Sequence, residues 1–84
     1  MRHLASPRFW QLYQALPAEA QELAHRSFTL LKSDARHPSL HLKRIDRLWS
    51  VRVGHHYRAL GTDVPGGILW VWIGTHADYD RIIA

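Results

Sequence analysis

The chain has 84 residues, of which 46% are hydrophobic and 21% charged. This length supports one hydrophobic core, so residues 1–84 are expected to form a single domain, and the composition excludes a disordered chain. Cysteine is absent, which excludes disulfides, thiolate metal sites and cysteine nucleophiles. The excess of 11 Lys and Arg over 7 Asp and Glu favours a polyanion or an acidic protein as partner.

Targeting and cofactor signals are not recognisable in the sequence. Residues 1–10 contain no apolar run like that of a signal peptide, and no segment approaches the ~20 apolar residues of a membrane span. We therefore expect a cytoplasmic protein without a membrane partner. The histidines His37 and His41 lack a third ligand at recognisable spacing, so no metal or other cofactor is expected.

The first half of the chain predicts two helices in a hairpin, preceded by a possible edge strand at residues 1–5. Ser6-Pro7 is a helix start, because serine accepts from an early backbone N–H and proline fits the first turn. Apolar residues then follow helical spacing, and Pro17 restarts the pattern. The stripes are Phe9, Leu12, Tyr13 and Leu16, then Ala20, Leu23, Ala24, Phe28 and Leu31.

The second half predicts an antiparallel sheet, because apolar residues alternate with polar ones after Pro38. The expected strands cover residues 40–43, 49–53, 55–61 and 68–73, with turns near Asp46-Arg47 and at 63–67. A short helical turn at 77–83 closes the chain. The fold class is therefore α+β, with helices before the sheet.

Basic side chains from separate strands are candidates for one site. Alternate positions on neighbouring strands lie within ~5 Å of each other, so Lys43, Arg52 and Arg58 can converge, with His76 at the end of the last strand. Clustered cations repel unless an anion lies between them, so this pattern favours a phosphate site. The alternative is that each cation is solvated or pairs with an acidic residue, namely Asp46, Asp63, Asp78 or Asp80.

Aromatic and histidine residues near these strands leave alternatives open. Trp70 and Trp72 are expected on one face, in phase with His76, where they stack on bases or, as we favour, fill core or a partner interface. His41 shares a face with Lys43 in an extended strand and lines a substrate groove or is solvated. The adjacent pair of histidines at 55–56 points to opposite faces of the predicted strand, so the two cannot chelate one ion.

An ordered set of motifs resembles the RelE/ParE toxin superfamily of bacterial toxin-antitoxin systems. These motifs are His37-Pro38-Ser39-Leu40, Lys43-Arg44, Leu48-Trp49-Ser50-Val51-Arg52-Val53-Gly54, Tyr57-Arg58-Ala59-Leu60 and Trp72-Ile73-Gly74-Thr75-His76. The resemblance covers nearly the whole chain. It implies a RelE-like fold, in which two N-terminal helices pack on a twisted antiparallel sheet of three to four strands, and it implies a cognate antitoxin.

The resemblance also implies site residues. Arg58 resembles the arginine that contacts the scissile phosphate, Arg52 resembles a basic strand residue of the same cluster, and His76 stands where RelE-like toxins carry a basic residue. Ser50 replaces a frequent lysine, and Tyr79 comes several residues before the tyrosine of RelE itself. The predicted catalytic residues are Arg58, His76 and Arg52, and the predicted substrate-binding residues are Lys43, Arg44, His41 and Tyr79.

The RelE-like branch implies an endoribonuclease, or mRNA interferase, that inhibits translation by cleaving mRNA, usually on the ribosome. A ribose 2′-OH attacks the adjacent phosphate, His76 acts as acid or base, and the arginines stabilise the added negative charge, without a metal. For His76 the alternative is a cap of the last helix. Two other functions remain open: a ParE-like toxin that inhibits DNA gyrase by binding, and an inactive member that only binds protein or RNA. The basic cluster favours the nuclease.

Overall fold

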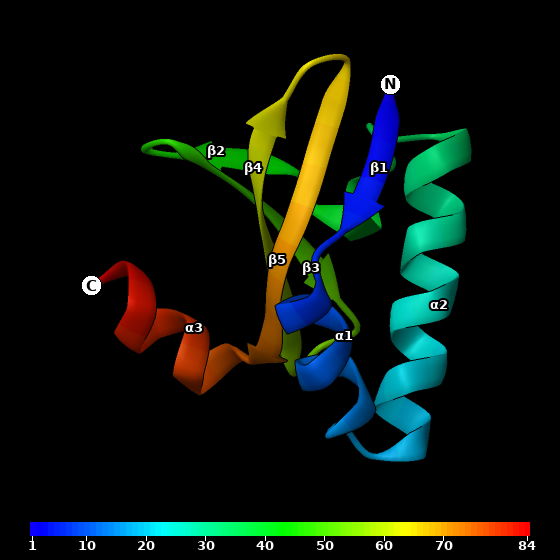
Figure 1. The fold of residues 1–84 in the computed structure, drawn as a ribbon. Helices are drawn as coiled ribbons and strands as arrows, with labels where there is room; N and C mark the ends of the chain where they lie inside the picture. The colour runs from blue at the N-terminus through cyan, green and yellow to red at the C-terminus, as the bar shows by residue number, and fades with distance from the viewer.

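A five-stranded sheet forms the centre of the computed structural model, which describes residues 1–84 (Figure 1). The strand order is β1-β5-β4-β3-β2, with β1 parallel to β5 and the other neighbours antiparallel. No helix is long and apolar enough to cross a membrane. In chain order the elements are β1 (Arg2–Ala5), α1 (Pro7–Gln14), α2 (Ala18–Ser33), the 3-10 helix η1 (Pro38–Leu40), β2 (Lys43–Ile45), β3 (Leu48–Val53), β4 (Tyr57–Val64), β5 (Gly67–Thr75) and α3 (His76–Ile83).

The two N-terminal helices begin where the sequence predicts. The Ser6 hydroxyl accepts a hydrogen bond from the Phe9 backbone N–H at 3.1 Å, and Pro7 occupies the first turn of α1. Helix α2 follows Pro17 directly. Both helices bury residues against one face of the sheet, which we call the helical face, because Phe9, Ala24 and Leu31 belong to the same ten-residue core as strand residues.

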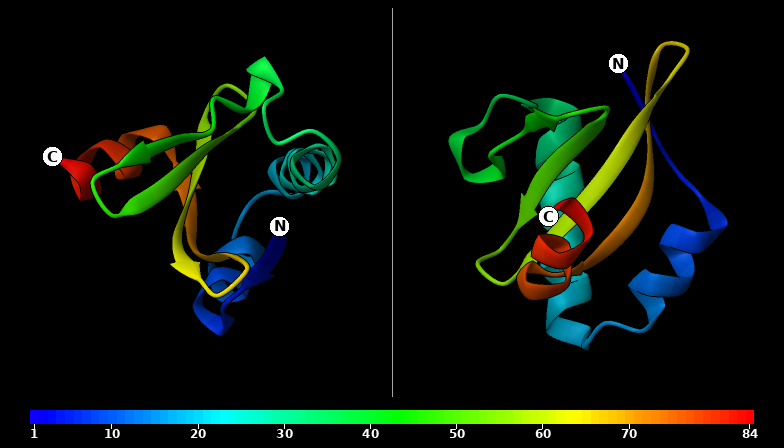
Figure 2. Two further views of the ribbon diagram at one scale, coloured as in Figure 1. Left: turned by 90° about the horizontal axis from the view of Figure 1, so that it is seen from above. Right: turned by 90° about the vertical axis from the view of Figure 1, so that its left-hand side faces the viewer.

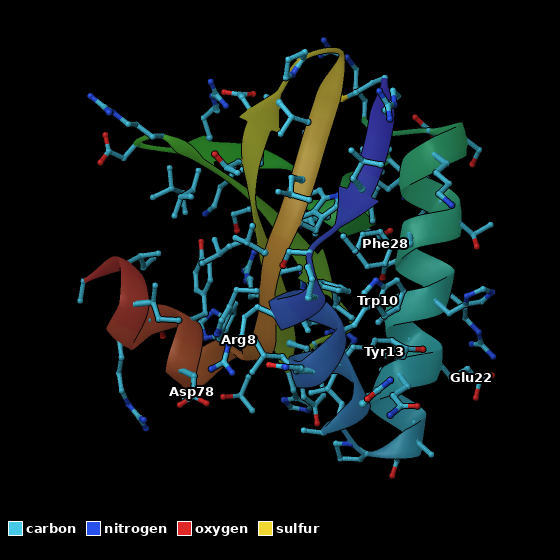
Figure 3. All side chains as sticks on the ribbon, viewed as in Figure 1. Arg8, Trp10, Tyr13, Glu22, Phe28 and Asp78 are labelled. Atoms are coloured by element: carbon cyan, nitrogen blue, oxygen red, sulfur yellow. The ribbon has the colours of Figure 1, made fainter.

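Helix α3 lies on the other face of the sheet, which we call the open face (Figure 2). Figure 3 shows the same division at the level of side chains. Phe28, Trp10 and Tyr13 lie between α1 and α2, whereas Asp78 lies on α3 across the sheet from them. The open face carries little of the core: Leu60 and Tyr79 are buried there, outside the ten-residue cluster. Polar side chains therefore have room on this face.

Local backbone geometry corrects two of the strand predictions. The segment 40–43 is not a strand, because η1 and a left-handed His41 (φ 45°) precede β2, which begins at Lys43. The segment 55–61 does not begin as a strand either, because Gly54 (φ 62°) starts a turn between β3 and β4 that contains His55 and His56. The N-terminal residues form β1 at the sheet edge, as the possible edge strand at residues 1–5 had indicated, so the sheet has five strands where the resemblance implied three to four.

An irregularity in β5 corrects the prediction for the two tryptophans. Leu60 pairs with Trp72 but Gly61 pairs with Trp70, so one extra residue of β5 lies between the two pairs. A bulge of this kind reverses the side to which following side chains point. Trp70 is therefore buried in the core on the helical face, whereas Trp72 lies on the open face. The two rings do not form one stacking surface.

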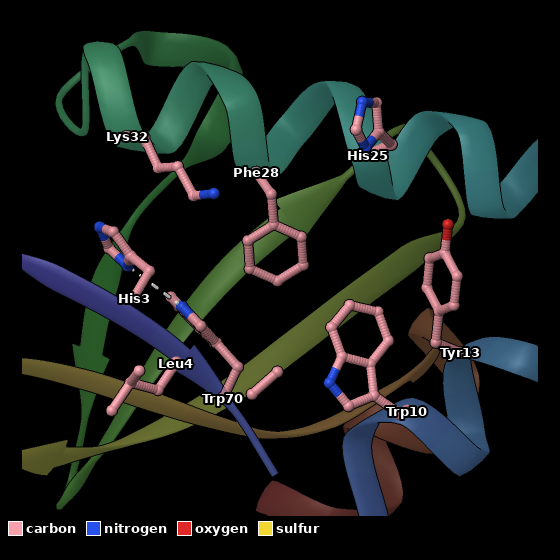
Figure 4. Close-up of a pocket in the computed structure, with 9 residues that line it drawn as sticks. His3, Leu4, Trp10, Tyr13, His25, Phe28, Lys32 and Trp70 are labelled. Carbon is pink, nitrogen blue, oxygen red and sulfur yellow. Dashed lines mark hydrogen bonds between the residues drawn. The ribbon is translucent and has the colours of Figure 1, made fainter. Parts of the chain in front are cut away.

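A cavity of about 180 Å³ opens between β1, α1 and α2 on the helical face. Figure 4 shows its aromatic lining and the hydrogen bond that Trp70 donates from Nε1 to His3 Nδ1 at 3.2 Å. Burial lowers the pKa of His3, and the positive charges of the N-terminus and Lys32 lower it further. The cavity is separated by the sheet from the basic residues of the open face.

Candidate functional site

Strand register brings the predicted basic residues to the open face. Lys43 pairs with Ser50, and Arg52 pairs directly with Arg58 on the next strand. Since Ser50 and Arg52 are two residues apart on β3, all four side chains point the same way. The four ion pairs of the structure include none of Lys43, Arg52 and Arg58. The carboxylate pairing considered for these three cations is therefore absent.

Arg58 has the least usual environment of these residues. Its Nε and Nη1 atoms are buried and have no hydrogen-bond partner. Its guanidinium carbon lies 5.3 Å from the centre of the Tyr79 ring, a cation–π contact. Arg52 stands directly opposite, and two like charges in that position destabilise a sheet. A bound anion on this face would offset this repulsion.

The Tyr79 ring packs against the Arg58 guanidinium and does not face solvent. Its side chain is 3% exposed, and its hydroxyl accepts a hydrogen bond from the Ser50 hydroxyl at 2.9 Å. The prediction that Tyr79 contacts substrate is therefore revised, because α3 buries this ring against the open face of the sheet. Ser50, whose side chain is fully buried, holds that hydroxyl in place. Sequence analysis gave Ser50 no role, and only its alternation with buried valines hinted at its position.

His76 stands at the start of α3, beside Tyr79, with its ring centre 5.9 Å from that of the tyrosine. Its Nδ1 lies 3.2 Å from Oδ2 of Asp80, one helical turn on. This contact leaves Nε2 as the ring nitrogen available to a ligand. Capping does not explain His76, because Thr75 caps α3 by accepting a hydrogen bond from the Asp78 backbone N–H. The sequence analysis had considered Asp80 only as a carboxylate partner of the basic residues, and of those residues His76 is the one it contacts.

Arg52 is held at the turn between β3 and β4. Its Nε donates to the carbonyl of Gly54 at 3.1 Å, and its Nη2 lies 3.0 Å from Nδ1 of His55. Lys43, on the edge strand β2, is exposed. Arg52 therefore borders the pair formed by Arg58 and Tyr79, and Lys43 stands farther out on the same face.

Arg44 does not join this cluster, because it follows Lys43 on the strand and so points to the helical face. Its Nη2 lies 2.7 Å from Oδ2 of Asp63, and its guanidinium stacks 4.5 Å from the Trp49 ring centre. Hydrogen bonds from Arg44 and from Trp49 lower the pKa of Asp63. His41 is likewise displaced, because its left-handed backbone takes it out of the extended strand that would have aligned it with Lys43.

Trp72 and Gly74 complete the open face around Arg58. Gly74 pairs with Arg58, and Trp72 lies two residues before Gly74. A Cβ at Gly74 would stand 2.5 Å from Cζ2 of Trp72, so the indole ring lies over the glycine. An aromatic ring therefore flanks the arginine on the solvent side of β5. The two-residue spacing between Trp72 and Gly74 is consistent with side chains on one face of a strand. The sequence analysis instead placed Trp72 on the same face as Trp70.

Comparison with known proteins agrees with this architecture. The family model of the ParE-like toxin domain matches residues 19–81. The chain belongs to the ParE-like toxin domain family. It is a toxin domain of the RelE/ParE type, as the motifs had indicated.

One solved structure extends the likeness to the N-terminal strand and helix of this toxin. The crystal structure of the RelB-RelE antitoxin-toxin complex from Methanococcus jannaschii superposes with a TM-score of 0.73 over 96% of this chain and 99% of that chain, at 13% sequence identity. At this identity the likeness shows the fold alone, which is RelE-like. Among curated protein sequences no significant match was found.

Proposed function

We propose that this toxin is an endoribonuclease that cleaves mRNA by attack of a ribose 2′-OH on the adjacent phosphate. The observation that supports the proposal best is Arg58, whose buried Nε and Nη1 have no acceptor. An unsatisfied buried guanidinium costs free energy and persists where function requires it. Arg52 pairs with it across the two strands, and a phosphate group bound beside both arginines would offset the repulsion between their charges.

The open face also supplies the groups for proton transfer. Asp80 holds Nδ1 of His76, an arrangement that fixes the orientation of an imidazole and leaves Nε2 to exchange a proton with the 2′-OH or the leaving 5′-oxygen. Arg58 and Arg52 then stabilise the negative charge that develops on the phosphate oxygens. Lys43 is placed to bind a neighbouring phosphate on the same face. No step requires a metal.

The proposed partners follow from the same likeness. The similar structure contains an antitoxin bound to its toxin, and we propose that an antitoxin is also the natural partner of this chain. Its net charge of +4 suits an acidic partner segment. The ribosome is proposed as the place of cleavage, because an mRNA in translation presents single-stranded linkages to a small basic domain.

Gyrase inhibition is the second candidate function, and the family match favours it. The matching model describes a ParE-like toxin domain, and the resemblance stated above links the ParE-like branch to inhibition of DNA gyrase by binding. In that function Arg58 and His76 would have no reacting phosphate, and the open face would serve as a binding surface only. The two functions therefore differ in whether His76 is needed for chemistry.

Induction of the toxin in growing bacteria, followed by primer extension on abundant mRNAs, tests the proposal. We expect new 5′ ends at regular codon positions with the unaltered chain, and their loss with His76→Ala, because a general acid or base contributes about 10²–10⁴-fold to a rate. His25→Ala, on the exposed surface of α2, serves as the matched control and should still cleave. Intact mRNA together with broken chromosomal DNA would establish the gyrase function instead.

A further inference from the structure

A second basic concavity lies at the edge of the sheet next to β2, and we call it the edge groove. It has a volume of about 550 Å³. Most of its lining comes from the segment between α2 and β2, and the rest comes from β2, β3 and Met1. Ten residues line it, none of them acidic: Met1, Ala35, Arg36, His37, Pro38, His41, Leu42, Lys43, Arg44 and Trp49.

The charge of the edge groove points to a polyanion. Arg36, Lys43 and Arg44 carry permanent positive charges, and of these only Arg44 has an ion pair, with Asp63. Arg36 and Lys43 are exposed and have no carboxylate partner. His37 and His41 add two imidazole rings, whose N–H groups can donate hydrogen bonds to an anion.

Lys43 connects the edge groove to the candidate site. It lines the groove, and its side chain shares the open face with Arg52 and Arg58. Lys43 pairs with Ser50, so Arg52 is its diagonal neighbour, at a typical separation of ~7–8 Å. A flexible anionic chain that binds at Arg58 can therefore pass Lys43 and enter the groove without leaving positively charged surface.

Trp49 gives the edge groove an aromatic wall. Its Nε1 donates to Oδ1 of Asp63 at 2.9 Å, and the same carboxylate holds Arg44 over the ring. These contacts fix both side chains before any ligand binds, which lowers the cost of ordering them. A groove that combines fixed cations with an aromatic ring is typical of surfaces that follow a single-stranded nucleic acid.

We propose that the edge groove binds the phosphate backbone of the single-stranded RNA segment adjacent to the scissile linkage. The proposal rests on the proposed nuclease function, to which it adds a second subsite outside the open face. It assigns backbone contacts to Arg36 inside the groove and to Lys43, which lies between the groove and the open face; among the cations that line the groove these two have no ion pair. Such contacts raise affinity for any sequence and do not select codons.

Fluorescence anisotropy with a labelled single-stranded RNA carrying 2′-O-methylribose at every position tests the groove without cleavage. The double variant Arg36→Gln/Lys43→Gln should bind roughly tenfold more weakly than the unaltered chain. The slope of log K against log salt concentration is negative, and its magnitude should decrease by about 1.4, since each lost phosphate contact removes ~0.7 for a single strand. Arg26→Gln/Lys32→Gln, on α2, removes the same two charges elsewhere and should change neither affinity nor slope beyond a small general effect.

The outcomes separate this inference from the proposed function. If the unaltered chain cleaves ribose-containing RNA but the groove variant binds like the α2 control, the groove proposal is wrong and the nuclease stands. If binding depends on the groove but the primer-extension assay shows no cleavage of translated mRNA, the groove stands as an RNA-binding site and the nuclease is wrong. If the groove variant keeps its RNA affinity but loses affinity for a polyglutamate peptide, the groove is a protein site and the proposal is overturned.

Discussion

Arg58 is the proposed phosphate-binding residue, and its unsatisfied nitrogens lower the stability of the folded state. Two of its guanidinium nitrogens are buried without acceptors, and Arg52 stands across the strand pair. Natural proteins tolerate such features where activity requires them. Replacing Arg58 should therefore increase stability and abolish activity.

Arg58→Met should make the toxin more stable and inactive. Methionine keeps much of the apolar stem and removes the unsatisfied donors, so the free energy of unfolding should rise by about 1–2 kcal/mol, as measured by urea denaturation. Inorganic phosphate should raise the unfolding midpoint of the unaltered chain by binding only its folded state, and should not do so for the variant. A variant that is less stable than the unaltered chain would show that Arg58 is satisfied in solution by contacts other than an anion.

At the scale of elements, the sequence allowed the helices to be placed well. Ser6-Pro7 and Pro17 start α1 and α2 as expected, because capping and the missing proline N–H are local chemistry. The strands were placed less well, since a left-handed His41 and the turn at Gly54 shorten two of them. Such backbone choices depend on what the neighbouring elements allow.

The caps of α1 and α3 offer a matched pair of substitutions. Thr75→Ala and Ser6→Ala each remove one side-chain acceptor from a backbone N–H, so each should lower the free energy of unfolding by about 1 kcal/mol. Only Thr75 starts the helix that carries His76, so only Thr75→Ala should also reduce the cleavage rate. Chemical denaturation and a cleavage assay measure the two effects. Equal loss of cleavage in both variants would mean that α3 is positioned by packing rather than by its cap.

At the scale of the whole molecule, the N-terminal strand pairs with the last strand of the sheet. β1 pairs in parallel with β5, 65 residues later at Arg2 and Gly67, and His3 accepts a hydrogen bond from buried Trp70. The imidazole Nδ1 must be unprotonated to accept this bond. The contact therefore depends on the protonation state of His3.

Stability should fall in mild acid because of His3. Its pKa in the folded chain lies below the ordinary 6.5, so the unfolded chain takes up a proton first as the pH drops. The stability contributed is complete above about pH 6.5 and is lost progressively as the pH falls below that value. His3→Gln, which keeps an acceptor for Trp70, should show a smaller drop in melting temperature between about pH 7.5 and about pH 5.5. An equal drop in both chains would assign the acid sensitivity to other groups.

The family resemblance and the α+β class followed from the sequence, because motif order, helix starts and period-two alternation are local properties of the chain. The same alternation indicated only that Arg52, Arg58 and Lys43 can share one face, and the strand register decided that they do. The surroundings of those side chains did not follow from the sequence. One extra residue in β5 sends Trp72 to the face opposite Trp70, and docking of α3 buries Tyr79 beside Arg58. These relations were decided by the tertiary structure, since register, bulges and helix docking depend on contacts between residues far apart in the chain.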